Sequence, residues 1–142
     1  MANRYFNQFP LALEKKVCNI FLRAAIGSSG AVTIDATNSK GVVSITKQAT
    51  AGQYKIIFGT NGTPVQNDIY NKLLQAKATV TNATGIPAAP DFAVLSTAST
   101  LGATGTAASS IFVQFSSGGV ATNLASGDEI YLQFIFGDST AP

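Results

Sequence analysis

The side chains that could perform acid–base chemistry in this sequence are its seven carboxylates. A glycosidase needs two carboxyl groups facing each other across a groove, one of them with a raised pKa. Asp128 and Glu129 are adjacent, but neighbours on a strand point to opposite faces of a sheet. Most of the others stand beside Gly, Ser or Asn, which is typical of turns. We therefore expect capping and solvation, rather than catalysis, to explain most of the seven carboxylates, which are Glu14, Asp35, Asp68, Asp91, Asp128, Glu129 and Asp138.

Histidine is absent from the sequence. This excludes Ser–His–Asp and Cys–His nucleophilic systems and most transition-metal sites. Cys18 alternates with apolar residues and is interpreted as a small buried hydrophobe, and a single cysteine cannot form an internal disulfide. A calcium site using Asp35 and Asn38 stays open, because hard oxygen ligands would suffice. We expect no enzyme activity, no cofactor and no small-molecule substrate.

Charged residues are unusually rare, at 11% of the 142 residues against about 25% in typical soluble domains. A neutral surface is less costly to bury against another subunit, because no ion must be desolvated. The composition therefore favours obligate assembly, although an ordinary β-domain with the same composition stays open. The net charge of +2 is scattered, which indicates no nucleic-acid partner. No apolar run reaches about 18 residues, so no membrane partner is expected.

Apolar and polar residues alternate along most of the chain, which predicts strands. The clearest hairpin joins Ser44–Lys47 to Tyr54–Phe58, and Glu129–Phe136 is the strongest single strand. About eight strands predict an all-β fold, either a β-sandwich or a jelly-roll-like barrel. The predicted strands are Lys16–Ile26, Ala31–Asp35, Gly41–Lys47, Gly52–Gly59, Lys77–Asn82, Asp91–Leu95, Ser110–Ser116 and Glu129–Phe136.

Two segments depart from this alternation. Val65, Ile69, Leu73 and Leu74 recur at helical spacing, so residues 64–75 are predicted to contain one short helix. Residues 96–109 consist of Ser, Thr, Ala and Gly around a single large apolar residue, Leu101. A stretch of this kind is predicted to be a loop or an interface segment. Its candidate contacts are Leu101 and Thr104.

The N-terminal segment is predicted to form an arm over residues 1–12, followed by one β domain over 13–137 and a tail over 138–142. Polar residues in the arm are interspersed with aromatic ones, and exposed aromatics favour burial against another surface. That surface could belong to the parent domain, a sister protomer or another protein. The candidate arm contacts are Arg4, Tyr5, Phe6 and Phe9. The first ten residues contain no continuous apolar run, so synthesis and folding in a cytoplasm are expected.

Three segments together resemble a known class of proteins: the opening MANRYFNQF, the hairpin GVVSITK with GQYKI, and the end VAT followed by SGDEIYLQF. They are similar to small virion structural proteins of tailed bacteriophages, of the kind found as capsid decoration or cement subunits. The resemblance implies a homotrimer on the capsid surface that contacts the major capsid protein and is made in the bacterial host cytoplasm. Many decoration proteins are more acidic than this chain, so a tail-tube, tail-tip or fibre-associated subunit stays open.

A carbohydrate-binding or adhesin module is the other alternative that fits a low-charge β-sandwich. Such a module would present exposed aromatic rings on one face or loop. The candidates for that role are Tyr54, Tyr70 and Tyr131, although packing within strands or a helix would explain them equally well.

Overall fold

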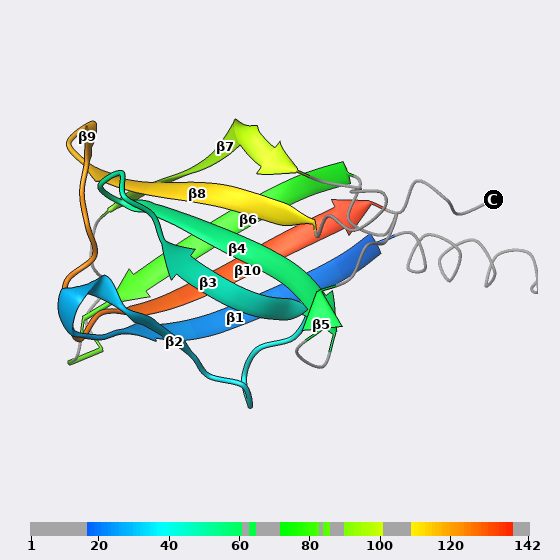
Figure 1. The fold of residues 1–142 in the computed structure, drawn as a ribbon, viewed down its shortest axis with the longest axis horizontal. Helices are drawn as coiled ribbons and strands as arrows, with labels where there is room; N and C mark the ends of the chain where they lie inside the picture. The colour runs from blue at the N-terminus through cyan, green and yellow to red at the C-terminus, as the bar shows by residue number, and fades with distance from the viewer. Residues whose placement is uncertain are drawn as a thin grey trace, which may run out of the picture.

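The fold is a sandwich of two antiparallel β-sheets (Figure 1). The computed structural model describes residues 17–60, 63–64, 72–82, 84–85, 90–100 and 109–137. Over these residues the predicted all-β class is confirmed, and the two facing sheets make the fold a sandwich. The described residues include no helix that is long and apolar enough to cross a membrane.

The four-stranded sheet has the order β2-β1-β10-β6, and the six-stranded sheet has the order β3-β4-β8-β7. Two short strands lie off the second path, where β5 pairs with β4 and β9 pairs with β8. A 3-10 turn, η1 (Ser28–Gly30), follows β1. The strands are β1 (Val17–Ile26), β2 (Val32–Ile34), β3 (Val42–Lys47), β4 (Gln53–Thr60), β5 (Thr63–Pro64), β6 (Lys72–Thr81), β7 (Asp91–Thr100), β8 (Ser110–Ser117), β9 (Val120–Ala121) and β10 (Glu129–Gly137).

The core forms because alternate residues of the central strands point between the sheets. On β10 the residues predicted to face inward are all buried, whereas Tyr131, Gln133 and Ile135 lie on the reverse. The same alternation buries the predicted inward residues of β4 and β8. The buried residues of these three strands are Tyr54, Ile56, Phe58, Ile111, Val113, Phe115, Ile130, Leu132, Phe134 and Phe136.

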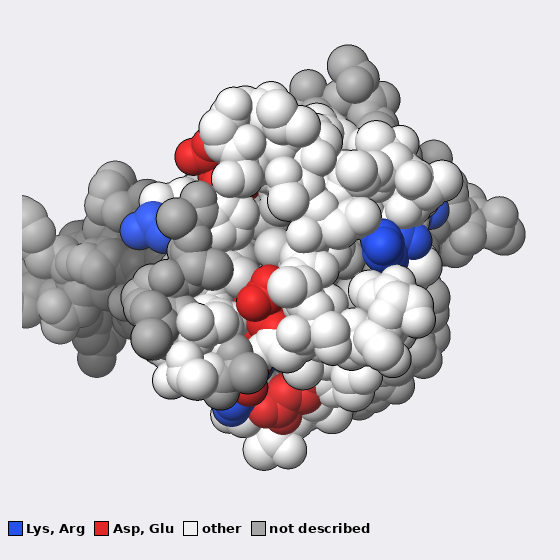
Figure 2. All heavy atoms as spheres, turned by 90° about the vertical axis from the view of Figure 1, so that its left-hand side faces the viewer, with Lys and Arg blue, Asp and Glu red and all other residues white. Residues whose placement is uncertain are grey.

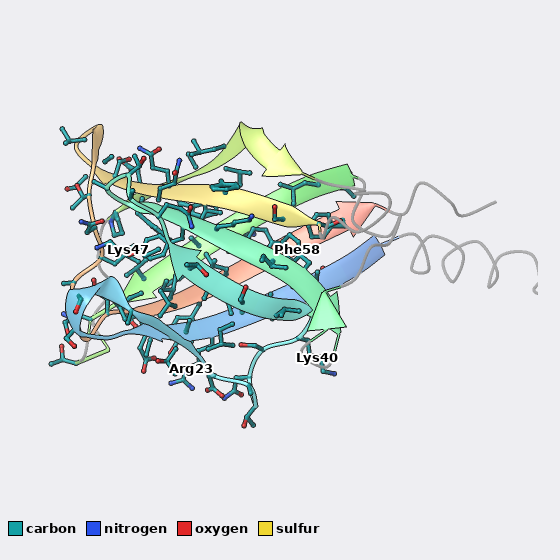
Figure 3. All side chains as sticks on the ribbon, viewed as in Figure 1. Arg23, Lys40, Lys47 and Phe58 are labelled. Atoms are coloured by element: carbon teal, nitrogen blue, oxygen red, sulfur yellow. The ribbon has the colours of Figure 1, made fainter. Side chains whose placement is uncertain are left out.

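Aromatic contacts join the two sheets across the core. The ring of Phe58 on β4 packs edge-to-face against two rings of β10, with centroids 5.5 Å from Phe134 and 5.2 Å from Phe136. Figure 3 shows Phe58 between the layers, whereas Arg23 and Lys40 lie at the surface. The Phe58 ring therefore links the two layers, because it is carried by one sheet and packs against side chains of the other.

The β3–β4 hairpin is confirmed, with Lys47 opposite Tyr54 and Ile45 opposite Ile56. Its turn contains Gly52, whose φ of +68° favours glycine. The Gly52 N–H donates to Asn123 Oδ1 at 2.9 Å, and the Gly52 carbonyl accepts from the Phe115 N–H at 2.9 Å. These bonds attach the turn to β8 and to the connection that leads into β10.

The helix predicted for residues 64–75 is wrong over its last residues. Strand β6 begins at Lys72, so Leu73 and Leu74 are extended. A register shift places Phe136 opposite Leu73 and Ile135 opposite Gln75, which leaves Leu74 as an extra, bulged residue. The bulge leaves Leu74 and Gln75 both exposed, so the in–out alternation expected of a strand is interrupted at this point. Residues 65–71 lie outside the described residues.

The loop predicted for residues 96–109 is also partly wrong. Strand β7 continues to Thr100, which pairs with Ser110 after a register shift from Leu95. Ser109 is buried, and its carbonyl accepts from the Phe58 N–H at 3.0 Å. Pairing with β8 therefore makes the start of this segment a strand, although its small side chains carry no apolar alternation. Residues 101–108 lie outside the described residues.

The two ends of the sandwich differ in which strand ends and turns they carry. Val17 at the start of β1 and Lys72 at the start of β6 both pair with Gly137, the last residue of β10. The end of β7 at Thr100 and the start of β8 at Ser110, which pair with each other, lie at the same end (Figure 1). The segment before β1 and the segment between β7 and β8 therefore join the sandwich at one end. The η1, β3–β4 and β8–β9 turns lie at the other.

Candidate interaction surface

The outward side of the four-stranded sheet exposes large apolar side chains. Among the described residues, four large hydrophobic side chains are exposed, and Phe21 (48%), Leu74 (51%) and Tyr131 (38%) lie on this one face. We call it the outer face. The fourth, Val120, belongs to the six-stranded sheet. The outer face comprises Asn19, Phe21, Arg23 and Ala25 on β1, Glu129, Tyr131, Gln133 and Ile135 on β10, and Leu74, Gln75, Lys77 and Thr79 on β6.

Strand register arranges these side chains in rows across the sheet. One row contains Phe21, Gln133 and Lys77, and the next contains Arg23, Tyr131 and Thr79. The bulge turns Leu74 to the same side, since a Cβ placed on Gly137 would lie 3.4 Å from Leu74 Cδ1. Gly137 follows Ile135 by two residues, and alternate residues share a face. The apolar side chains are thus distributed over all three long strands.

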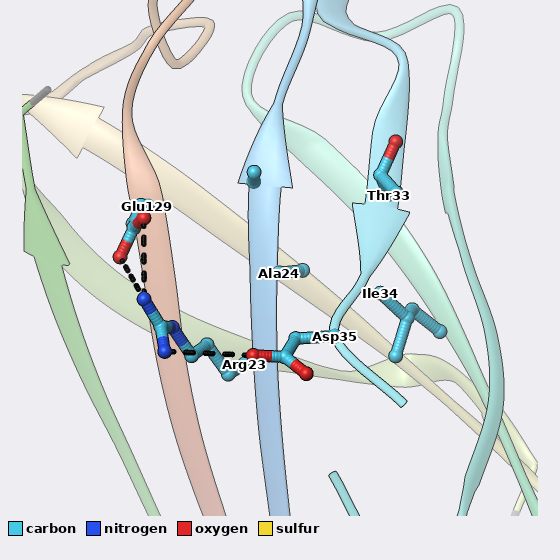
Figure 4. Close-up of a pocket in the computed structure, with 7 residues that line it drawn as sticks. Arg23, Ala24, Thr33, Ile34, Asp35 and Glu129 are labelled. Atoms are coloured by element: carbon cyan, nitrogen blue, oxygen red, sulfur yellow. Dashed lines mark hydrogen bonds and ion pairs between the residues drawn. The ribbon is translucent and has the colours of Figure 1, made fainter. Parts of the chain in front are cut away.

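Arg23 on β1 forms the centre of the one ionic cluster found among the described residues. Its Nη2 lies 3.1 Å from Glu129 Oε2 on β10, and its Nη1 lies 3.4 Å from Asp35 Oδ2 just after β2. Figure 4 shows the guanidinium between the two carboxylates. The Tyr131 hydroxyl donates to Glu129 Oε2 at 2.6 Å, and the Arg23 guanidinium carbon lies 5.5 Å from the Tyr131 ring centre. Four side chains from three segments therefore support one another.

Hydrogen bonds and charge lower the pKa of both carboxyl groups in the cluster. Donation from Tyr131, followed by Arg23, lowers the pKa of Glu129. The Asn38 side-chain amide lowers the pKa of Asp35, and the backbone N–H groups of Asn38 and Thr37 and the charge of Arg23 act in the same direction. A general acid in a glycosidase needs a raised pKa. The cluster is therefore built to hold two carboxylates ionised, and its geometry favours a structural role.

The arrangement around Asp35 does not match a calcium site. Its two oxygens accept from the Thr37 and Asn38 backbone N–H groups and from the Asn38 side-chain amide, and Arg23 adds a cation. Asn38 thus presents its nitrogen, whereas Ca²⁺ requires oxygen ligands. Over the part of the chain that the structure describes, no three Asp, Glu or Cys residues are grouped to hold a metal.

The pKa of Tyr131 is raised above its ordinary value, chiefly by hydrogen bonding to Glu129. A raised pKa means that this bond stabilises the fold below the ordinary tyrosine pKa of about 10 and ceases to do so as the pH rises through the folded value. We expect Glu129→Gln to lower the Tyr131 pKa toward that ordinary value. NMR titration of ring-labelled tyrosine would measure it, with Tyr131→Phe to assign the signal. An unchanged Tyr131 pKa in Glu129→Gln would contradict the cluster.

Most of the contact residues selected from the sequence are not among the described residues. Arg4, Tyr5, Phe6 and Phe9 of the arm, and Leu101 and Thr104 of the loop, lie outside the described residues, as does Tyr70. Tyr54, a candidate for stacking on a sugar, is wholly buried and cannot serve. Tyr131 is exposed, but Arg23 lies over its ring.

The outer face itself was not anticipated. Its signal in the sequence was the pair Phe21 and Ile135, which are large apolar residues on the sides of their strands opposite the core. Figure 2 shows another part of the surface, the end that carries the β8–β9 turn, where a few charged side chains lie on a mostly uncharged surface. The low charge of the sequence is thus visible on the molecule.

Comparison with known proteins gave no match: no family model, curated protein or solved structure is significantly similar to this chain.

Proposed function

We propose that this protein is a non-enzymatic structural subunit of a tailed-bacteriophage virion that decorates the capsid and stabilises it. The observation that supports the assembly role is the outer face, which exposes Phe21, Leu74 and Tyr131 on one side of one sheet. Contiguous exposed apolar surface on a soluble domain usually marks an interaction site. The capsid location rests on the resemblance of the N-terminal, hairpin and C-terminal segments described above.

The charged groups of the outer face are also compatible with burial of this face against a partner. Arg23 already has two carboxylate partners within its own chain. A partner that covers the face therefore need not supply a counter-ion for this cation, and burial does not leave it unpaired. A decoration subunit of this kind stabilises a shell by binding the assembled form better than the free subunits.

The two ends of the sandwich fit the same role. The predicted arm and the predicted contact loop join the domain at one end, beside Val17 and between β7 and β8. The points at which these two segments join the sandwich thus lie at a common end, which supports one contact region.

Mass spectrometry and cryo-electron microscopy of particles of the phage whose genome encodes this chain would test the proposal. We expect the protein in stoichiometric copies on the outer capsid, and we expect capsids assembled without it to lose their genome at lower temperature. A location on the tail would exclude capsid decoration and support a tail-associated subunit instead. Absence of the protein from purified particles, or a gene that belongs to no phage, would exclude the virion role.

A further inference from the structure

We propose that the outer face packs against the same face of a second copy of this chain, about a two-fold axis that lies in the plane of the interface. This deepens the proposed assembly function and rests on it. The occupant is identified by charge: the positive and negative groups of the face are placed so that one face complements another of its own kind.

The two relevant charges lie on opposite sides of the outer face, toward β2 and on β6. The cluster of Arg23, Asp35 and Glu129 contains one cation and two carboxylates, and so has a net charge of −1. Lys77 lies two strands from β1, in the row of Phe21. No described residue forms an ion pair with Lys77. An excess negative charge and an unpaired cation are thus available on the same surface.

Strand register places a two-fold axis between these two sides. Adjacent strands lie about 4.8 Å apart, and alternate residues along a strand about 6.8 Å apart. On that grid, we place the two-fold axis diagonally across the sheet, so that it passes beside Phe21 and between Tyr131 and Gln133. Rotation about this axis brings Lys77 of each copy opposite the Arg23 cluster of the other. Phe21 then meets Phe21 of the second copy, and the two Tyr131 side chains lie close by. A two-fold contact of this kind uses one patch on both subunits.

The proposed geometry agrees with known sheet packing. An axis at about 45° to the strands crosses the two sheets at about 90°, one of the two common angles for packed sheets. The remaining cation beside Phe21 is Lys40, whose backbone N–H donates to the Phe21 carbonyl at 2.8 Å. In the same arrangement Lys40 faces the amide of Asn19, so Lys40 and Lys77 do not oppose each other.

The size of the face limits the area that the contact can bury. Three long strands give a footprint of roughly 15 Å by 30 Å. That is about 450 Å² in projection, smaller than the ~800 Å² per partner of a standard stable interface. We therefore expect a dimer with a dissociation constant in the micromolar range, which repeated contacts on a particle would reinforce.

Sedimentation of the isolated full chain tests the proposal. We expect a monomer–dimer equilibrium that Phe21→Asp weakens at least about 30-fold, as for a central interface residue. Val120→Asp, an equally drastic change at the exposed apolar residue of the six-stranded sheet, should leave the equilibrium unchanged. Circular dichroism confirms that both variants fold. A protein that is monomeric throughout, or that forms only trimers, would overturn the two-fold contact.

Charge reversal tests the register. Lys77→Glu brings a carboxylate opposite the net-negative cluster and should weaken the dimer about tenfold. Lys55→Glu makes the same change on the outward side of β4 and should have no effect. Equal losses in both variants would indicate that overall charge, rather than the predicted pairing, controls association.

Cross-linking locates the axis. In a Cys18→Ala background, Phe21→Cys should give a covalent dimer with a short bis-maleimide, whereas Val120→Cys should not. Packed sheets lie about 10 Å apart, which is too far for a direct disulfide. A dimer that cross-links only through Val120→Cys would place the contact on the other sheet.

These results are separable from those on the proposed function. If the protein dimerises through this face but is absent from virions, the two-fold contact stands and the virion role is excluded. A protein that is present on virions but monomeric in solution, and that loses capsid binding on Phe21→Asp, would show that the shell covers the outer face instead of a second copy.

Discussion

Phe58→Ala is expected to destabilise the domain by about 3–5 kcal/mol, the usual cost of removing a buried phenylalanine. The large value follows from its position, because the ring is fully buried and contacts both Phe134 and Phe136 of the opposite sheet. Its removal leaves a cavity between the layers that neither sheet can close alone. For a domain of this size the thermal midpoint should fall by about 10–20 °C.

Urea unfolding at a protein concentration well below the expected micromolar dissociation constant measures the loss of stability, because self-association would otherwise stabilise the folded state. Phe21→Ala is the matched control, because it removes the same side chain from a half-exposed position on the outer face. We expect the control to cost about 1 kcal/mol or less. Equal losses in the two variants would mean that Phe58 does not join the sheets as described.

Gly52→Ala is expected to cost about 3 kcal/mol or more, through backbone strain and overlap together. Gly52 has a φ of +68°, which side chains other than glycine rarely adopt. A Cβ there would overlap the Phe115 carbonyl oxygen and lie 2.8 Å from the Thr122 carbonyl oxygen. Both contacts are with backbone atoms of the β8–β10 region, so no side chain can rotate away.

Gly118→Ala separates the two causes. Gly118 also has a positive φ, at +57°, but a Cβ there would meet nothing within 4 Å. Gly118→Ala should therefore lower the free energy of unfolding by only about 1 kcal/mol, the conformational cost of a positive φ for alanine. Thermal unfolding of both variants compares them directly. If Gly52→Ala were no worse than Gly118→Ala, the close approach of the β3–β4 turn to β8 would be wrong.

The fold could be predicted where burial imposes a simple period on the sequence. Strand β10 and the β3–β4 hairpin have large apolar residues at every second position, since one side of each strand faces the core. The start of β6 could not be predicted, because the bulge at Leu74 disrupts that period. The extension of β7 to Thr100 was missed because it depends on pairing with β8, which residues 96–100 do not reveal.

The candidate site was harder to predict because its residues are remote in sequence. Arg23 and Glu129 lie 106 positions apart and meet only because β1 pairs with β10 in one register. The low charge of the chain favoured assembly as a hypothesis. It could not indicate the outer face, because single residues such as Phe21 acquire meaning only when their neighbours across the sheet are known.

The pairing of Val17 with Gly137 has a mechanical consequence. Strands β1 and β10 are antiparallel neighbours, and their hydrogen bonds run perpendicular to the strands. A force that pulls these two residues apart loads the bonds singly, from the open end inward, as in a zipper. The domain should therefore yield at low force when stretched between Val17 and Gly137. In the proposed role on a shell, load would therefore have to enter the domain at points other than these two residues.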